Sequence, residues 1–194
     1  MFHSVKSTFI TYSICVLGII FALLSIWYGS FLPLRKAQQY ITSLRFAQGG
    51  FIRNFDDFQN NFNRALQFSS PVGDEEVAKF LSSDIAGLIS DPKQPEVVRR
   101  TLVEYIAPYM EKNNVRHLIT LAGMYRALWS TYKQEADFQS AERYYRDALA
   151  IGQKLPPVLY SLLDLYSQKG DMVRTEEIKN KIMSMWDDPR LRTL

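Results

Sequence analysis

The hydrophobic pattern of the chain opens with one long segment that carries no charge. From Phe9 to Leu32 the sequence reads FITYSICVLGIIFALLSIWYGSFL. At roughly 1.5 Å per residue, a helix of this length crosses about 30 Å of hydrocarbon. Trp27 and Tyr28 near its end carry the ring types that favour a membrane interface. The pattern predicts an N-terminal tail over residues 1–8 and one transmembrane helix over residues 9–32, with the lipid bilayer as the partner of that helix.

A cleaved secretory signal is the main alternative for this segment, because Lys6 precedes the apolar run. The run is longer than the roughly 7–15 apolar residues of a typical signal, and no small-x-small cleavage site closes it. A lipoprotein signal is excluded because Tyr12, Ser13 and Ile14 before Cys15 do not form the small-residue attachment box. We therefore expect a retained anchor in the cytoplasmic (inner) membrane.

The orientation of this single-pass anchor stays open on the sequence. Lys6 lies before the span, whereas Arg35, Lys36 and Arg45 follow it, and the positive-inside rule then places the C-terminal domain in the cytoplasm. A short tail with a lysine before an apolar span is also how a signal anchor begins, and a signal anchor exports its C-terminal domain. The balance leans to an extracytoplasmic domain because of a resemblance described below.

Beyond the span, apolar residues recur at spacings of three and four, which predicts amphipathic helices. Breaks at Gly49-Gly50, at 69–73 and at 91–95 separate them, and Pro108 ends or kinks the last. A phenylalanine stripe at 51, 55, 58 and 62 has the spacing of a core face rather than of a ligand site. We expect an all-α chain, with degenerate helical repeats over residues 35–110.

From Arg116 onward, two consecutive stretches of the chain have similar patterns of apolar residues. Tyr132 and Tyr166 lie 34 residues apart (166 − 132), and each precedes a turn and a second apolar run. Thirty-four residues is the period of tetratricopeptide helix pairs. The pattern predicts two such repeats over residues 116–189, one spanning 122–155 and one spanning 156–189.

Residues 122–189 resemble the tetratricopeptide repeat family at Tyr132, Ala141, Tyr145, Ala148, Tyr166 and Gly170. Trp129 and Leu163 stand where many members have glycine, and Thr175 and Lys179 replace the usual alanine and aromatic residue. These departures indicate a divergent or capping last repeat. The resemblance implies a short helical-hairpin solenoid, which would follow the transmembrane helix predicted from the apolar run.

A broader resemblance covers most of the chain. The stretch FLPLRKAQQYITSLRFAQ, then FDDFQNNFNRALQFSSPVGDEEVAKFL, then the repeats, is similar to the C-terminal portion of bacterial O-antigen ligase or polymerase-type membrane proteins. Those proteins owe catalysis to a multi-span domain that this sequence does not contain. The resemblance implies an accessory piece of that machinery, with its tail outside the cytoplasmic membrane.

Composition and side-chain chemistry argue against catalysis and against several partner classes. The net charge is +3 with acids and bases interspersed, so no nucleic-acid partner is expected. His117, interpreted as a surface residue, has no second imidazole or thiol beside it for a metal, and the acids at 74–76 are typical of a helix start. No phosphate loop, serine elbow or HExxH motif occurs. We expect neither enzyme activity nor a cofactor.

In the tetratricopeptide register, the first helix of each pair lines the concave face. The resemblance then makes polar side chains the candidate contacts for an extended peptide or helix of a protein partner: Arg126, Ser130, Lys133, Tyr160, Asp164 and Gln168. The alternative for each is a solvated surface position. The sequence therefore predicts a membrane-anchored scaffold or adaptor, and alternatively an accessory subunit of a cell-surface glycan ligase or polymerase system.

Overall fold

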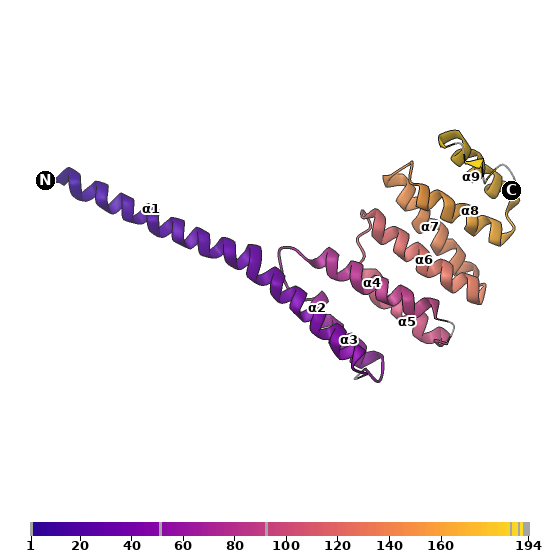
Figure 1. Cartoon of the computed structure of the whole chain (residues 1–194), viewed down its shortest axis with the longest axis horizontal. Helices are drawn as coiled ribbons and strands as arrows, with labels where there is room; N and C mark the ends of the chain where they lie inside the picture. The colour runs from indigo at the N-terminus through magenta and orange to yellow at the C-terminus, as the bar shows by residue number, and fades with distance from the viewer. Residues whose placement is uncertain (1, 51, 92, 187, 190, 192–194) are drawn as a thin grey trace. The chain divides into compact units, whose positions relative to one another are not determined.

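The protein is all-α, as its sequence predicts, and no strand occurs among the residues that the structure describes. A computed structural model describes residues 2–50, 52–91, 93–186, 188–189 and 191 (Figure 1). The chain forms two compact units, one over residues 1–77 and one over residues 78–194. Each unit is built from helices joined by short turns.

The first unit begins with an uninterrupted helix in three parts: α1 (Phe2–Ile26), a π-helical segment (Trp27–Phe31) and α2 (Leu32–Gln48). The predicted boundaries separate a transmembrane helix over residues 9–32 from the helices that start at residue 35, and no break between them is found. The amide of Leu32 donates to the carbonyl of Trp27, five residues back. A proline lacks the amide donor and crowds the carbonyl four residues earlier, so a π-turn just before Pro33 lets the helix continue. Residues 2–8, predicted as a tail, belong to α1.

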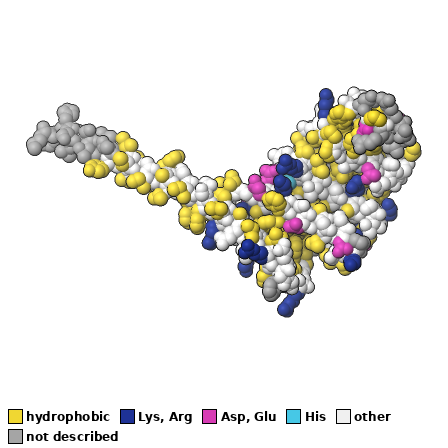
Figure 2. Space-filling model, in the orientation of Figure 1, with side chains coloured by type: hydrophobic (Ala, Val, Ile, Leu, Met, Phe, Trp, Pro, Cys, Tyr) yellow, Lys and Arg dark blue, Asp and Glu magenta, His cyan; other side chains and the backbone are white. Residues whose placement is uncertain are grey.

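This helix is long and apolar enough to cross a membrane. From Tyr12 to Gln48 it has 37 residues, and no part of its most hydrophobic stretch is buried against the protein. Figure 2 shows hydrophobic side chains along its described part. Exposed apolar surface of this extent is typical of a helix that lies in a bilayer.

Helix α3 (Phe55–Leu66) folds back against α2. It begins where the side chain of Asn54 accepts a hydrogen bond from the amide of Asp57 at 2.8 Å. Phe62 is buried and its ring lies 4.7 Å from that of Phe58, so this part of the phenylalanine stripe packs as core. Phe51, the first member of the predicted stripe, lies outside the described residues.

Lys36 is not in water, although the sequence places it just past the span. Its side chain is 1% exposed, and its ammonium donates to the carbonyl of Phe68 at 2.8 Å and to the carboxylate of Asp74. Gly73, at φ +100°, brings the chain against the lysine stem. The acid predicted to cap the next helix is thus engaged by Lys36, and the pair fixes the chain segment that follows α3.

The second unit consists of helical hairpins. Its helices follow one another along the chain as α4 (Asp74–Ser90, whose first turn belongs to the first unit), α5 (Glu96–Ile106, with a 3₁₀ turn Ala107–Tyr109), α6 (Val115–Tyr132), α7 (Glu135–Ile151), α8 (Pro156–Lys169) and α9 (Met172–Met185). Two-residue connections join α6 to α7 and α8 to α9, so each of these pairs is antiparallel and closely packed.

The hairpins recur every 37 residues, not every 34. Lys133 and Gly170 both adopt the left-handed conformation that ends the first helix of a pair, with φ +55° and +80°, and they lie 37 residues apart (170 − 133). At this spacing Ala141 and Tyr145 of α7 correspond to Ile178 and Ile182 of α9, and all four are buried. The spacing of Tyr132 and Tyr166 therefore does not superpose the two turns. Thr175 and Lys179, interpreted above as departures, do not occupy the core positions of α9.

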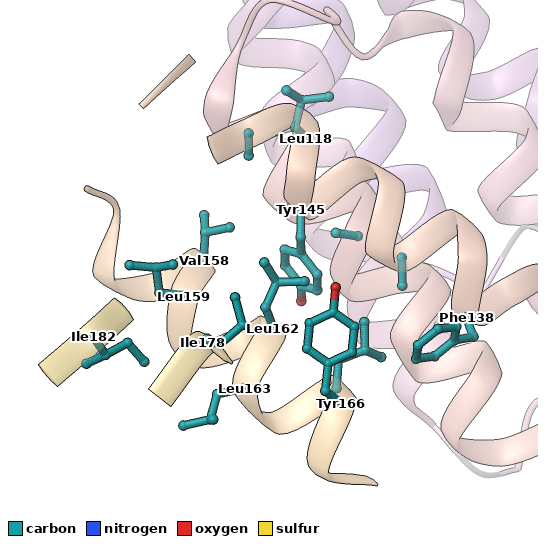
Figure 3. Close-up of a cluster of buried hydrophobic side chains, with 14 of the residues drawn as sticks. Leu118, Phe138, Tyr145, Val158, Leu159, Leu162, Leu163, Tyr166, Ile178 and Ile182 are labelled. Atoms are coloured by element: carbon teal, nitrogen blue, oxygen red, sulfur yellow. The ribbon is translucent and has the colours of Figure 1, made fainter. Parts of the chain in front are cut away.

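The core of the second unit lies between α6, α7, α8 and α9 (Figure 3). The ring of Phe138 stands 5.4 Å from Trp129 and 6.3 Å from Tyr166, so one aromatic residue of α7 joins the first helices of two successive pairs. Ala141 and Ala148 are completely buried on α7 and let the neighbouring helices approach closely.

An ion pair ties α5 to the start of α7. The two outer guanidinium nitrogens of Arg100 each donate to one carboxylate oxygen of Asp137 at 2.9 Å, and its Nε donates to Glu96 at 2.8 Å. Asp137 is 3% exposed. Hydrogen bonding to Asp137 raises the pKa of Arg100 above its ordinary value. This bidentate geometry is the strongest form of ion pair between side chains.

Candidate functional site

A hollow runs along the first helices of the successive pairs in the second unit. Its first part, a cavity of about 340 Å³, is lined by small side chains at helical spacing: Ser83, Ala86 and Ser90 of α4 and Thr120, Gly123 and Ala127 of α6, with Met124. Small residues on both walls leave the space unfilled. We call this hollow, together with its continuation toward α8, the α4–α6–α8 groove.

The continuation is a cavity of about 300 Å³ that shares Ser90, Gly123 and Ala127 with the first. It extends along α6 to Thr131 and reaches Gln168 of α8. The shared walls make one groove across three helices. Those helices are the first members of three successive hairpins (Figure 1).

Equivalent faces of α4 and α6 line the groove. Ala86, Gly123 and Tyr160 are spaced by 37 residues (123 − 86 and 160 − 123), and so are Ser90, Ala127 and Asp164. The turns at Lys133 and Gly170 set this spacing between α6 and α8, and the lining of the first cavity shows the same spacing between α4 and α6. The side chains are small on α4 and α6 and larger on α8, where Tyr160 and Asp164 occupy them. Tyr160 and Asp164 line neither cavity, and among the described residues Gln168 is the one of α8 that reaches the groove.

Four of the six residues predicted from the sequence come together here. Arg126, Ser130 and Gln168 line the groove. The guanidinium of Arg126 donates to a carboxylate oxygen of Asp164 at 2.5 Å. The side-chain amide of Gln168 donates to the same oxygen at 2.9 Å. The side chains of Arg126 and Asp164 are 37% and 46% exposed. The structure thus places a neutralised pair of opposite charges, still accessible, where α6 faces α8.

The other two predicted residues are engaged elsewhere. Lys133 is the left-handed residue that ends α6, and its ammonium lies 4.5 Å from the centre of the Trp129 ring. The hydroxyl of Tyr160 donates to Asp188, which follows α9. Neither residue lines the cavities of the groove. Lys133 lies at the end of α6 beside Trp129, and Tyr160 is hydrogen-bonded to the C-terminal segment.

Sequence reasoning missed the floor of the groove. Gly123, Ala127 and the small residues of α4 carry no chemistry by type, and the 34-residue register aligned other positions with α8. The signal that identifies them is their recurrence at 37 residues, from Ser83 to Thr120, from Ala86 to Gly123 and from Ser90 to Ala127. The structure reveals that spacing, through the wall that α4 and α6 share and through the turns at Lys133 and Gly170.

His117 is buried, at 2% exposed, so its interpretation as a surface residue is wrong. Asn114 caps α6 and turns His117 inward, where its Nδ1 accepts the amide hydrogen of Glu111 at 2.9 Å. Among the described residues, no group of three or more histidine, cysteine or acidic side chains is placed to hold a metal. His117 serves to hold the loop before α6 against the fold.

The perturbed tyrosines have structural causes. Burial raises the pKa of Tyr105, Tyr125 and Tyr166 above the ordinary value. Tyr125 also stacks on Tyr144 at 5.7 Å, and Tyr166 donates to Glu142 at 2.8 Å. All three stay neutral at physiological pH and act as packing and hydrogen-bonding groups between helices.

Comparisons with known proteins add no family to this description. The chain matches no protein-family model, no curated protein and no solved structure. The two resemblances drawn from the sequence therefore stay predictions, and the geometry of the groove is the guide to function.

Proposed function

We propose that this chain is a single-pass membrane scaffold or adaptor whose α4–α6–α8 groove binds a segment of a partner protein and so supports assembly of a membrane or envelope complex. The observation that carries the proposal is the groove itself, formed by equivalent faces of α4 and α6 and closed at one end by Gln168 of α8. A surface of that kind suits an extended peptide or a helix. The role requires no catalysis, no cofactor and no metal.

The floor of the groove favours close approach of another backbone. Gly123 and Ala127 have little or no side chain, and a Cβ atom built at Gly123 meets no atom within 4 Å. The hydroxyls of Ser90 and Thr120 donate to carbonyls of their own helices, which leaves their oxygens to accept from a peptide amide. A partner segment would lie against α6 with its side chains spread toward α4 and α8.

The polar end of the groove determines which partner segments bind well. Arg126 and Asp164 neutralise each other, so an entering segment gains most if it offers both an acid and a base or a hydrogen-bonding side chain. An exposed pair of this type contributes about 0–1 kcal/mol to folding, so exchanging it for contacts with a partner costs little. We therefore expect a polar partner segment.

The apolar helix would hold this groove at the cytoplasmic (inner) membrane, with the C-terminal domain outside the cytoplasm. The hairpin array is tetratricopeptide-like in this proposal, although its 37-residue spacing exceeds the 34 residues of that family. The fully exposed surface of the apolar helix also suits packing against other membrane helices. That observation favours the second candidate, an accessory subunit of a cell-surface glycan ligase or polymerase system.

Replacing Gly123 with leucine is expected to abolish partner recovery without harming the fold. The new side chain projects into the groove and fills it, while leucine in place of glycine strengthens a helix by up to about 1 kcal/mol. The measurement is co-purification of the partner with the full-length protein after mild detergent extraction, which should fall by about tenfold or more.

Gly87→Leu is the matched control. Gly87 lies on α4, is exposed and has open space around it, but does not line the groove. This variant should recover the partner as the unmodified protein does. If Gly123→Leu recovers as much partner as Gly87→Leu does, the groove is not the binding site. If replacing residues 9–32 with an unrelated span abolishes recovery of the partner, the accessory-subunit candidate is favoured.

A further inference from the structure

A second cavity, of about 580 Å³, lies in the first unit between α2 and α3. It is distinct from the groove, and ten of its eleven described lining residues have polar or charged side chains, with Phe68 as the exception. We call it the α2–α3 cavity. Its volume falls in the range of small-molecule sites, about 300–1,000 Å³.

The walls of this cavity are fixed by the hairpin that forms it. The hydroxyl of Ser43 donates to the backbone carbonyl of Asn61 at 2.7 Å. The side-chain amide of Asn61 donates back to the backbone carbonyl of Ser43 at 2.8 Å. Ser43 is 2% exposed, and the rings of Tyr40 and Phe62 pack nearby at 6.3 Å. Reciprocal bonds and aromatic packing hold α2 and α3 at a set separation, so the cavity belongs to the fold.

The charge in the cavity is of one sign. Arg35 and Arg64 line it, and no acid does among the described residues. Neither arginine forms an ion pair within the described part of the chain, although Arg35 lies 5.8 Å from the centre of the Phe31 ring. Two unneutralised guanidinium groups beside one hollow form a site for an anion, and their planar forks suit the oxygens of a phosphate.

The remaining lining groups are suited to hydroxyls. Gln39 lines the cavity, and its side-chain oxygen is shielded from solvent with no hydrogen-bond partner in the described structure. A buried acceptor of this kind is unusual in a folded protein and is satisfied by a donor that a ligand brings. Thr42 and Asn60 lie on the same walls. The ligand should therefore carry hydroxyl groups beside its phosphate.

The position of the cavity along the helix identifies the source of such a ligand. Arg35 follows the uncharged segment by three residues, and the helix is continuous from Tyr12 to Gln48. At about 1.5 Å per residue, Arg35 lies roughly 5 Å and Thr42 roughly 15 Å beyond Leu32. The headgroup layer extends roughly 5–8 Å beyond the hydrocarbon on each side. The cavity thus begins at the depth of lipid headgroups, provided that residues 9–32 span the bilayer as in the proposed function.

We propose that the α2–α3 cavity binds the headgroup of an anionic phospholipid. Arg35 and Arg64 hold the phosphate, and the unpartnered side-chain oxygen of Gln39 accepts from a hydroxyl of the headgroup. A glycerol phosphodiester has this chemistry. The bound headgroup ties the first hairpin after the membrane to the bilayer surface.

The experiment uses the full-length protein in detergent, incubated with equal amounts of phosphatidylglycerol and phosphatidylcholine, with bound lipid counted by native mass spectrometry. The unmodified protein should retain phosphatidylglycerol preferentially. The double variant Arg35→Gln with Arg64→Gln should lose this preference by about tenfold, since two charge-assisted contacts are removed. Thr42→Trp, which fills the cavity without changing the charge, should lose it as well.

The control is Arg45→Gln with Arg53→Gln, which removes the same charge from exposed positions of the same unit that do not line the cavity. It should keep the preference within about twofold. Equal loss in this control would overturn the proposal in favour of diffuse attraction by basic residues. Displacement of the lipid by millimolar inorganic phosphate would also overturn it and assign the cavity to a soluble phosphate compound. Because no protein partner takes part in the assay, its outcome is independent of the Gly123→Leu test.

Discussion

Replacing Arg100 with methionine is expected to lower the free energy of unfolding of the second unit by about 3 kcal/mol. Methionine keeps much of the arginine stem but leaves the carboxylate of Asp137 buried without its bidentate partner. Removing one member of a buried pair costs about 3–5 kcal/mol, and the lower value applies because Arg100 is 27% exposed and its loss admits water. The measurement is urea unfolding of the full chain in detergent, followed by far-UV circular dichroism.

Two variants separate this effect from a general loss of charge. Arg126→Met removes an arginine whose partner, Asp164, is 46% exposed, and it should cost less than about 1 kcal/mol. The double variant Arg100→Met with Asp137→Leu removes both charges and should recover much of the lost stability. An Arg100→Met protein as stable as Arg126→Met would show that the pair does not join α5 to α7.

Leu162→Ala is expected to destabilise the second unit by about 3 kcal/mol through the cavity it leaves. Leu162 of α8 is 1% exposed and belongs to the core between α6, α7, α8 and α9. Because that core is shared by two successive hairpins, the loss should appear as one cooperative transition moved to lower urea. The same unfolding measurement applies.

Leu88→Ala makes the identical chemical change on α4, at a position 39% exposed. It should cost less than about 1 kcal/mol, since leucine and alanine have similar helix propensity and little apolar surface is uncovered. If Leu162→Ala and Leu88→Ala unfold at the same urea concentration, the packing of α8 described above is wrong.

The helices were predictable from the sequence because their boundary signals are local. Gly170 takes the left-handed conformation and the side chain of Asp171 accepts the amide hydrogen of Arg174, as the Gly-Asp pair predicts. Pro156 begins α8, and α2 ends at Gln48 before the two glycines. Each of these signals acts within a few residues, so the spacing of residue types is sufficient to find them.

The register between hairpins was not predictable in the same way. Positions three residues apart share a helix face, so a repeat of 34 and a repeat of 37 align nearly the same apolar residues. Only the turns distinguish the two, and the left-handed turn at Lys133 has no glycine to mark it. The exposure of Lys36 and His117 was predicted wrongly for a related reason. A polar residue type does not indicate the distant residues that pack around it and bury it.

The charged and polar residues of the candidate site were predicted from the sequence, but the groove that they border was not. Arg126, Asp164 and Gln168 were selected by residue type and do meet across α6 and α8. The hollow itself depends on residues that lack side-chain bulk, Gly123 above all, and on the equivalent face of α4. A groove is defined by what its walls leave unfilled, which a search for chemically active residues does not detect.

Site-specific photo-crosslinking in living cells tests whether the α4–α6–α8 groove binds a protein segment. A photoreactive amino acid at Gly123 of the full-length membrane protein should form one discrete protein adduct. The same residue at Gly87 should form none, and Ala127→Leu should suppress the adduct at Gly123. Equal adducts at Gly123 and Gly87, or an adduct that survives Ala127→Leu, would contradict the claim.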